Sequence, residues 1–143
     1  MKDFQLPLRE PENSLFGPVI HAYTRAQVLA DGVLVDVTEI SKEVGFNLPV
    51  AITEALHNCL PSTKADAAIG QDYDGRLWDV LWLAAFTIKL ADHGREVVAF
   101  TVLQQEVEAK SGQPKEIQLP LRAVCEPGDE GEPVITIGFP EDF

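Results

Sequence analysis

The chain has 143 residues, of which 45% are apolar and 24% are charged. A chain of this length and composition can bury a real core and is typical of one globular domain. Its 23 acidic and 11 basic residues give a net charge of −12. A surface of that charge repels phosphate, which disfavours direct binding to nucleic acid or anionic membranes and leaves a protein partner, in particular a basic one.

Two cysteines, Cys59 and Cys125, are too few for a disulfide framework or a zinc site with four thiolates. Residues 1–7 lack the apolar run of a secretory signal. The longest apolar stretch, residues 80–86, is far shorter than the ~20 residues that span a bilayer. These features predict buried free thiols and a cytoplasmic protein without a membrane segment.

The N-terminal part of the sequence predicts two regions of different order. Prolines and mixed charges without a period predict a flexible arm or strap over residues 1–15, and a single domain follows over residues 16–143. Within that domain, Thr24 and Gln27 have the spacing of a capping box. They predict a short helix that stops at Gly32.

The next forty residues alternate between short elements. Residues 33–37 are mostly β-branched or apolar and predict a strand. Thr38 is placed to cap a helical turn over residues 39–44. A proline in the first turn and apolar residues on one side predict a helix over residues 49–60, with a connecting loop over residues 61–71.

The most apolar element is a predicted helix over residues 74–91. Its apolar side chains point in nearly every direction around a helix. We therefore expect a central helix that is covered on several sides, with Trp78 or Trp82 buried in the core.

The last third of the chain changes to a period of two. Residues 96–103, 116–125 and 133–139 predict three strands, and Pro120 in the second indicates an edge position or a bulge. Helices followed by consecutive strands predict the α+β class. The expected arrangement is a layer of N-terminal helices, one of them central and very apolar, packed on a C-terminal antiparallel β-meander.

Carboxylates near the start of the central helix offer a possible metal site. Residues 72–75, Asp-Tyr-Asp-Gly, have the alternation of a calcium loop, but Gly70 and Leu81 stand where the first and last ligands would be. Helix capping explains these carboxylates better. Asp79 lies between apolar residues and needs a partner, for which Arg76 is three residues away. A carboxylate of shifted pKa in a pocket is the functional alternative.

The histidines do not form a recognisable site. His21, His57 and His93 lack the short spacing of zinc motifs, and the sequence has no P-loop, dinucleotide fingerprint or nucleophile elbow. The sequence therefore predicts no metal and no cofactor. A Cys-His pair that the fold assembles stays open.

Four carboxylates crowd the loop between the last two predicted strands: Glu126, Asp129, Glu130 and Glu132. Such a cluster is typical of a solvated hairpin turn. It also fits a docking surface for a basic protein. These four residues are therefore the predicted partner-binding site.

Three stretches of sequence carry a resemblance when taken together: residues 21–37 (HAYTRAQVLADGVLVDV), 70–82 (GQDYDGRLWDVLW) and 122–137 (RAVCEPGDEGEPVITI). They resemble a family of small bacterial proteins with a domain of unknown function, found in phage, plasmid and other mobile-element genes. The likeness spans about residues 18–142. It implies a shared fold and a genetic context, and it carries over no activity, cofactor or catalytic residue.

These observations favour a non-enzymatic accessory protein of a mobile element that binds a host or element-encoded protein, with inhibition of host defence as one form of that role. The alternative is a small hydrolase whose site uses Asp72, Asp74, Asp79 or a histidine. A homo-oligomeric structural component is the third hypothesis. Converging Asp and His groups in a pocket would favour the enzyme, whereas a closed surface would favour the binder.

Overall fold

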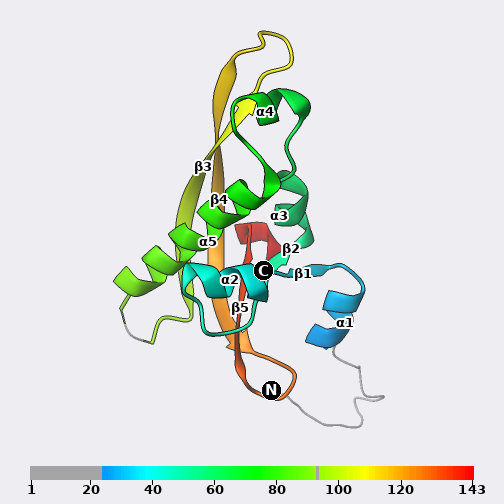
Figure 1. The fold of residues 1–143 in the computed structure, drawn as a ribbon. Helices are drawn as coiled ribbons and strands as arrows, with labels where there is room; N and C mark the ends of the chain where they lie inside the picture. The colour runs from blue at the N-terminus through cyan, green and yellow to red at the C-terminus, as the bar shows by residue number, and fades with distance from the viewer. Residues whose placement is uncertain (1–23, 93) are drawn as a thin grey trace.

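The structure is a computed structural model that describes residues 24–92 and 94–143. The predicted arm over residues 1–15 lies outside these residues, as do His21 and His93. The described residues have the predicted α+β class, with five α-helices and one five-stranded mixed sheet (Figure 1). In chain order the elements are α1 (Arg25–Ala30), β1 (Leu34–Asp36), α2 (Thr38–Val44), β2 (Val50–Thr53), α3 (Glu54–Cys59), α4 (Lys64–Ala68), α5 (Tyr73–Leu90), β3 (Val97–Val107), β4 (Pro114–Pro127), β5 (Pro133–Gly138) and a short 3-10 helix, η2 (Pro140–Asp142).

The sheet has the strand order β1-β2-β5-β4-β3. Strands β3, β4 and β5 are consecutive antiparallel neighbours, which is the predicted meander. Strand β2 pairs in parallel with β5, and β1 pairs antiparallel with β2 at the far edge. The N-terminal half therefore contributes two strands as well as helices, which the expected arrangement did not include.

The predicted helix over residues 49–60 is wrong in its first half, where the chain forms β2. Val50 and Ile52 pair with β5 and are at most 1% exposed. Their β-branched side chains favour a fully buried parallel strand over a helix. Helix α3 begins only at Glu54, and the Thr53 hydroxyl caps it by accepting from the amide of Leu56.

The shorter helices follow their capping residues. Thr24 and Gln27 form the predicted capping box of α1. Helix α2 begins at Thr38 itself, with Val37 in the cap position, so the prediction that Thr38 is the cap is wrong. The Thr38 hydroxyl donates to Asp36 Oδ1 (2.6 Å) instead. Helix α4 lies within the region that was predicted to be a loop.

Pro120 lies in β4, which has a neighbour on each side. The amide of Cys125 donates to the Glu96 carbonyl (2.7 Å), so odd-numbered residues of β4 bond to β3 and the ring nitrogen of Pro120 points to the β5 side. Strand β5 ends at Gly138, which faces Arg122. Because no β5 residue lies beside Pro120, β4 is locally an edge there, and the missing donor costs nothing.

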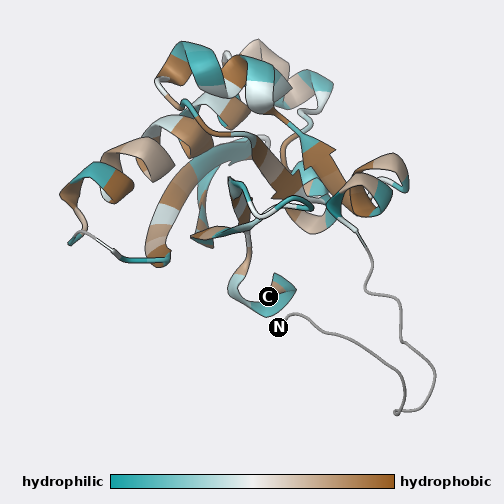
Figure 2. Ribbon diagram, turned by 90° about the horizontal axis from the view of Figure 1, so that it is seen from below, coloured by the Kyte–Doolittle hydropathy of each residue, from teal (hydrophilic) through white to brown (hydrophobic). Residues whose placement is uncertain are grey.

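Side chains of the long strands alternate between a buried and an exposed face. In Figure 2, where the ribbon is coloured by hydropathy, polar and apolar bands follow one another along the strands. Helices α3 and α5 cover the buried face. On the opposite face α1 contributes Arg25, whose guanidinium donates to Thr136 Oγ1 (2.8 Å). The buried core contains Val37, Val50, Ile52, Leu56, Leu60, Leu77, Val80, Leu81, Ala84, Val98, Val102, Leu119, Leu121, Ala123, Ile135 and Ile137.

Candidate binding surface

Four apolar side chains form a row along the solvent side of α5: Trp78, Trp82, Phe86 and Leu90. They are four residues apart, so they lie on one face of the helix. Their exposed fractions are 37%, 50%, 46% and 71%. The rings of Trp82 and Phe86 are stacked, with centroids 5.3 Å apart and planes 7° from parallel. We call these four residues the apolar row.

The apolar row contradicts the prediction that the helix is covered on several sides. Leu77, Val80 and Leu81 pack into the core, but both tryptophans are exposed, so the expected burial of Trp78 or Trp82 is wrong. The helix lies beside β3, the last strand of the sheet, and no described element covers its outer side (Figure 1). Among the described helices, none has the length and hydropathy of a membrane span.

Strand β3 leaves part of its backbone without a partner. The Glu96 carbonyl accepts from β4, so even-numbered residues of this strand face β4 and odd-numbered residues face outward. Within the part of the chain that the structure describes, no hydrogen bond reaches the outward backbone groups of Val97, Ala99, Thr101 or Leu103. We call the outer side of residues 97–103 the open edge.

A shallow depression joins the open edge to the apolar row. It has a volume of about 500 Å³ and is lined by Trp78, Asp79, Trp82, Leu83, Thr101, Val102 and Leu103. Residues 101–103 of β3 contribute one part of its lining, and α5 contributes the other part, which includes both tryptophans. The row and the edge are therefore one continuous surface, which we call the β3–α5 surface.

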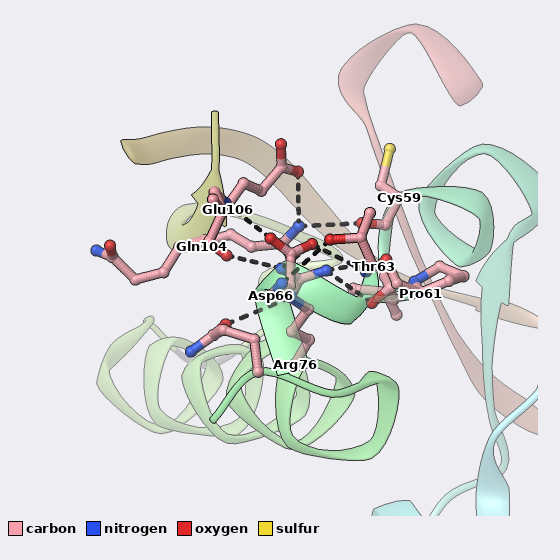
Figure 3. Close-up of polar contacts among 11 residues, drawn as sticks. Cys59, Pro61, Thr63, Asp66, Arg76, Gln104 and Glu106 are labelled. Carbon is pink, nitrogen blue, oxygen red and sulfur yellow. Dashed lines mark hydrogen bonds and ion pairs between the residues drawn. The ribbon is translucent and has the colours of Figure 1, made fainter. Parts of the chain in front are cut away.

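A buried ion pair closes the other end of the same edge (Figure 3). Arg76 Nη2 lies 3.3 Å from Asp66 Oδ2, and the two side chains are 3% and 5% exposed. Asp66 Oδ1 accepts from the amide of Val107 (2.7 Å), and Arg76 Nη2 donates to the carbonyl of Gln105 (2.7 Å). Both β3 groups are of the outward kind, so the pair occupies the positions that a further strand would need.

The ion pair is held by neighbouring segments. Arg76 Nη1 donates to the carbonyls of Leu60 (3.1 Å) and Pro61 (2.9 Å). The amide of Thr63 donates to Asp66 Oδ2 (3.1 Å). Hydrogen bonds from the Val107 amide and then from Thr63 lower the pKa of Asp66 from 3.8 to about 2, and the charge of Arg76 adds to the effect. The carboxylate is therefore fully charged at neutral pH.

Sequence reasoning missed the partner of Arg76. Asp79, three residues away, was the expected partner, but it is exposed and lines the depression instead. The available signal was Thr63-x-x-Asp66, a capping-box spacing that the structure realises at the start of α4. It predicts the helix, although not the ion pair, which depends on a strand forty residues further on.

The structure gives most of the predicted acidic site an internal role. Asp129 accepts from the amides of Arg25 (2.7 Å) and Ala26 at the start of α1. Glu126 lies 3.6 Å from the Arg25 guanidinium and also accepts from Thr136. Glu132 accepts from the amide of Glu130 (2.9 Å). The four carboxylates share one loop, but only the Glu130 side chain makes no hydrogen bond or ion pair within the described residues.

The groups proposed for a hydrolase do not converge in the described residues. Asp72 caps α5 by accepting from the amide of Gly75 (2.7 Å), and Asp74 lies in the first turn. Asp79 faces the depression. His57 Nδ1 lies 2.8 Å from the Tyr73 hydroxyl. No carboxylate of the described residues forms a hydrogen bond with either side chain. No group of three His, Cys, Asp or Glu in these residues could hold a metal ion.

The two thiols are free, but the prediction that they are buried is wrong for Cys125, which is exposed. Cys59 is partly buried, and burial raises the pKa of its thiol, with smaller contributions from Glu106 and Asp142. A raised pKa makes it a poor nucleophile. Cys125 lines a cavity of about 480 Å³ between the end of α5 and the sheet, together with Arg95 and other residues. His57, the histidine that the structure describes, does not line this cavity.

The burial pattern of α5 makes a prediction about stability. Leu81 is fully buried, so Leu81→Ala should lower the free energy of unfolding by about 2–5 kcal/mol. Trp82→Ala removes a larger side chain from the surface and should cost less than about 1 kcal/mol. Denaturant unfolding of both variants measures this. Equal losses would place Trp82 in the core.

The lowered pKa of Asp66 makes a prediction about acid stability. A carboxyl group whose pKa is lower in the folded chain stabilises the fold above its unfolded pKa, and this contribution is lost as the pH falls from about 4 to about 2. Asp66→Asn should remove that part of the pH dependence. Unfolding curves between these pH values, with the exposed Glu43→Gln as control, test it. An unchanged slope for Asp66→Asn would contradict the assignment.

Comparison with known proteins places the chain in a family. No curated protein and no solved structure matches it. One family model matches residues 13–143, and its description is "Family of unknown function (DUF6573)". Because the match covers nearly all of the 143 residues, the chain belongs to this family of unknown function.

Proposed function

We propose that this protein is a non-enzymatic accessory protein that acts by binding an extended segment of another protein chain at the β3–α5 surface. The observation that carries the proposal is the position of the apolar row directly beside an unpaired strand edge. The resemblance to proteins of phage and plasmid genes supports a partner encoded by such an element or by its bacterial host.

The composition of the open edge supports binding over a purely structural role. Residues 97–103, Val-Val-Ala-Phe-Thr-Val-Leu, contain no charged residue and no proline. Proteins usually protect an exposed edge strand with such residues, because an unprotected edge pairs with other chains. A long edge without this protection fits a site that is covered when the protein works.

The dimensions suit strand addition. The apolar row covers thirteen residues of helix from Trp78 to Leu90, or about 18 Å, which equals the length of about five or six residues of a strand. Added strands gain affinity from main-chain hydrogen bonds and specificity from pockets for alternate side chains. The depression between Trp82 and Thr101 would receive one such side chain.

The proposed function needs no catalytic site. Apolar contacts and backbone hydrogen bonds recognise a strand without any charged group, and Asp79 is the one charged residue that lines the depression. Most of the affinity at this surface should therefore come from contacts that salt does not screen, because screening acts mainly on exposed charges. The acidic loop would act only on the rate at which a basic partner approaches.

The test is photo-crosslinking in the native host from position 103, where Leu103 is 53% exposed beside the depression. We expect a photoreactive residue there to capture a protein chain, and the same residue at the exposed position 43 on α2 to capture none. Thr101→Pro removes one outward amide while leaving the bonds to β4, so it should reduce capture at least about tenfold.

The matched control is Thr101→Ala, which keeps the amide and should preserve capture. Circular dichroism checks that both variants are folded. Capture that is absent from position 103, or that is indifferent to Thr101→Pro in a folded variant, would refute the proposal.

A further inference from the structure

The open edge has two ends that the chain itself defines. At one end β3 begins at Val97, directly after a turn in which the Arg95 amide donates to the Asp92 carbonyl (3.3 Å). At the other end the Gln105 carbonyl is bound by Arg76 (2.7 Å). Only the seven residues between these limits can accept a partner strand. Any strand that fills the site must match this length.

A second copy of the same stretch fills it symmetrically. If two such strands run antiparallel about an axis at Phe100, Val97 of one copy faces Leu103 of the other, and Ala99 faces Thr101. These four residues carry the outward backbone groups. In this register the amide and carbonyl of each one bond to the carbonyl and amide of the residue that it faces. A shift of the register by two residues in one direction would place Val97 against Gln105, whose carbonyl is already bound. A shift in the other direction would place Leu103 against Arg95, which lies outside the strand.

The apolar rows would meet in the same arrangement. Helix α5 runs antiparallel to β3, because Asp79 lies beside residues 101–103 while Leu90 lies beside Val98 and Ala99. The middle of the row therefore lies next to the axis at Phe100, and each Leu90 approaches the Trp78 end of the other row. Pairing of the strands and covering of the exposed aromatic rings then occur together.

The charges at the two ends of the surface are complementary. Asp79 borders the depression beside Thr101 to Leu103. Arg95 lies beside Val98 and Ala99, where Asp92 lines the same end and offsets part of its charge. Antiparallel pairing brings these ends opposite each other, so Asp79 of each copy approaches Arg95 of the other. This attraction acts twice in a symmetric pair and opposes the repulsion between two chains of charge −12.

We infer that the chain that occupies the β3–α5 surface is a second copy of this protein, paired through β3 into one continuous ten-stranded sheet. The inference rests on the proposed function and names the partner of that same surface. A symmetric pair of this kind uses one patch on both copies, as two-fold dimers do.

Sedimentation equilibrium of the full chain tests the inference. We expect a dimer whose association constant falls at least about ten times further in Thr101→Pro than in Thr101→Ala, which keeps the outward amide. Both tryptophans of the chain lie in the apolar row. Dimer formation should therefore shift their fluorescence emission to shorter wavelength as concentration rises.

Charge reversal tests the register without touching the backbone. Asp79→Arg and Arg95→Asp should each weaken the dimer about tenfold, because like charges then face each other, and the double variant should recover most of the loss. Glu43→Arg changes the net charge as much as Asp79→Arg but lies on α2. It should leave the association constant unchanged.

The outcomes separate this inference from the proposed function. A monomer at about 100 µM that still shows amide-dependent capture of a different protein from position 103 overturns the second-copy inference alone. A dimer that ignores Thr101→Pro and both charge reversals also overturns it, because another surface then forms the dimer. A monomer without any capture contradicts both.

Discussion

The ion pair of Asp66 and Arg76 connects parts of the chain that are far apart in sequence. Arg76 belongs to α5 and donates to the carbonyls that follow α3, while Asp66 belongs to α4 and accepts from the backbone of β3. Gln104 adds a bond from β3 to the Cys59 carbonyl at the end of α3 (3.0 Å). Unpaired buried charges are costly. The pair therefore requires three helices and a strand to be in place together.

The same pair decides which part of the sheet edge is available. It uses the outward groups of Gln105 and Val107, so strand addition is blocked toward the hairpin end of β3. From Val97 to Leu103 no group of the described residues does so, and helix α5, which carries the apolar row, runs beside this stretch (Figure 1). A protein that only needed to protect its edge would gain from extending the polar closure. The limit of the closure is the structural basis of the proposed binding role.

Several elements followed from short-range signals. The long helix begins after Asp72, whose carboxylate binds an amide three residues on, and the period of two in residues 116–125 predicted β4. Other elements were missed because they depend on contacts with distant parts of the chain. The local sequence of residues 50–53 is compatible with the start of a helix. These residues form a strand because β5, more than eighty residues later, supplies a parallel neighbour. The tryptophans were expected in the core because hydropathy records the character of a side chain and not what covers it.

The sequence by itself determined the class of the fold, the caps of α1 and α5, and the positions of the long helix and the last three strands. These features depend on hydrogen bonds and side-chain periods within a few residues of one another. Only the tertiary structure decided that Asp129 caps a helix 103 to 104 residues away, that Arg76 binds Asp66, and that α5 lies at the last strand of the sheet with its aromatic side uncovered. Those outcomes depend on which distant segments become neighbours, and the local pattern of side chains carries no record of that choice.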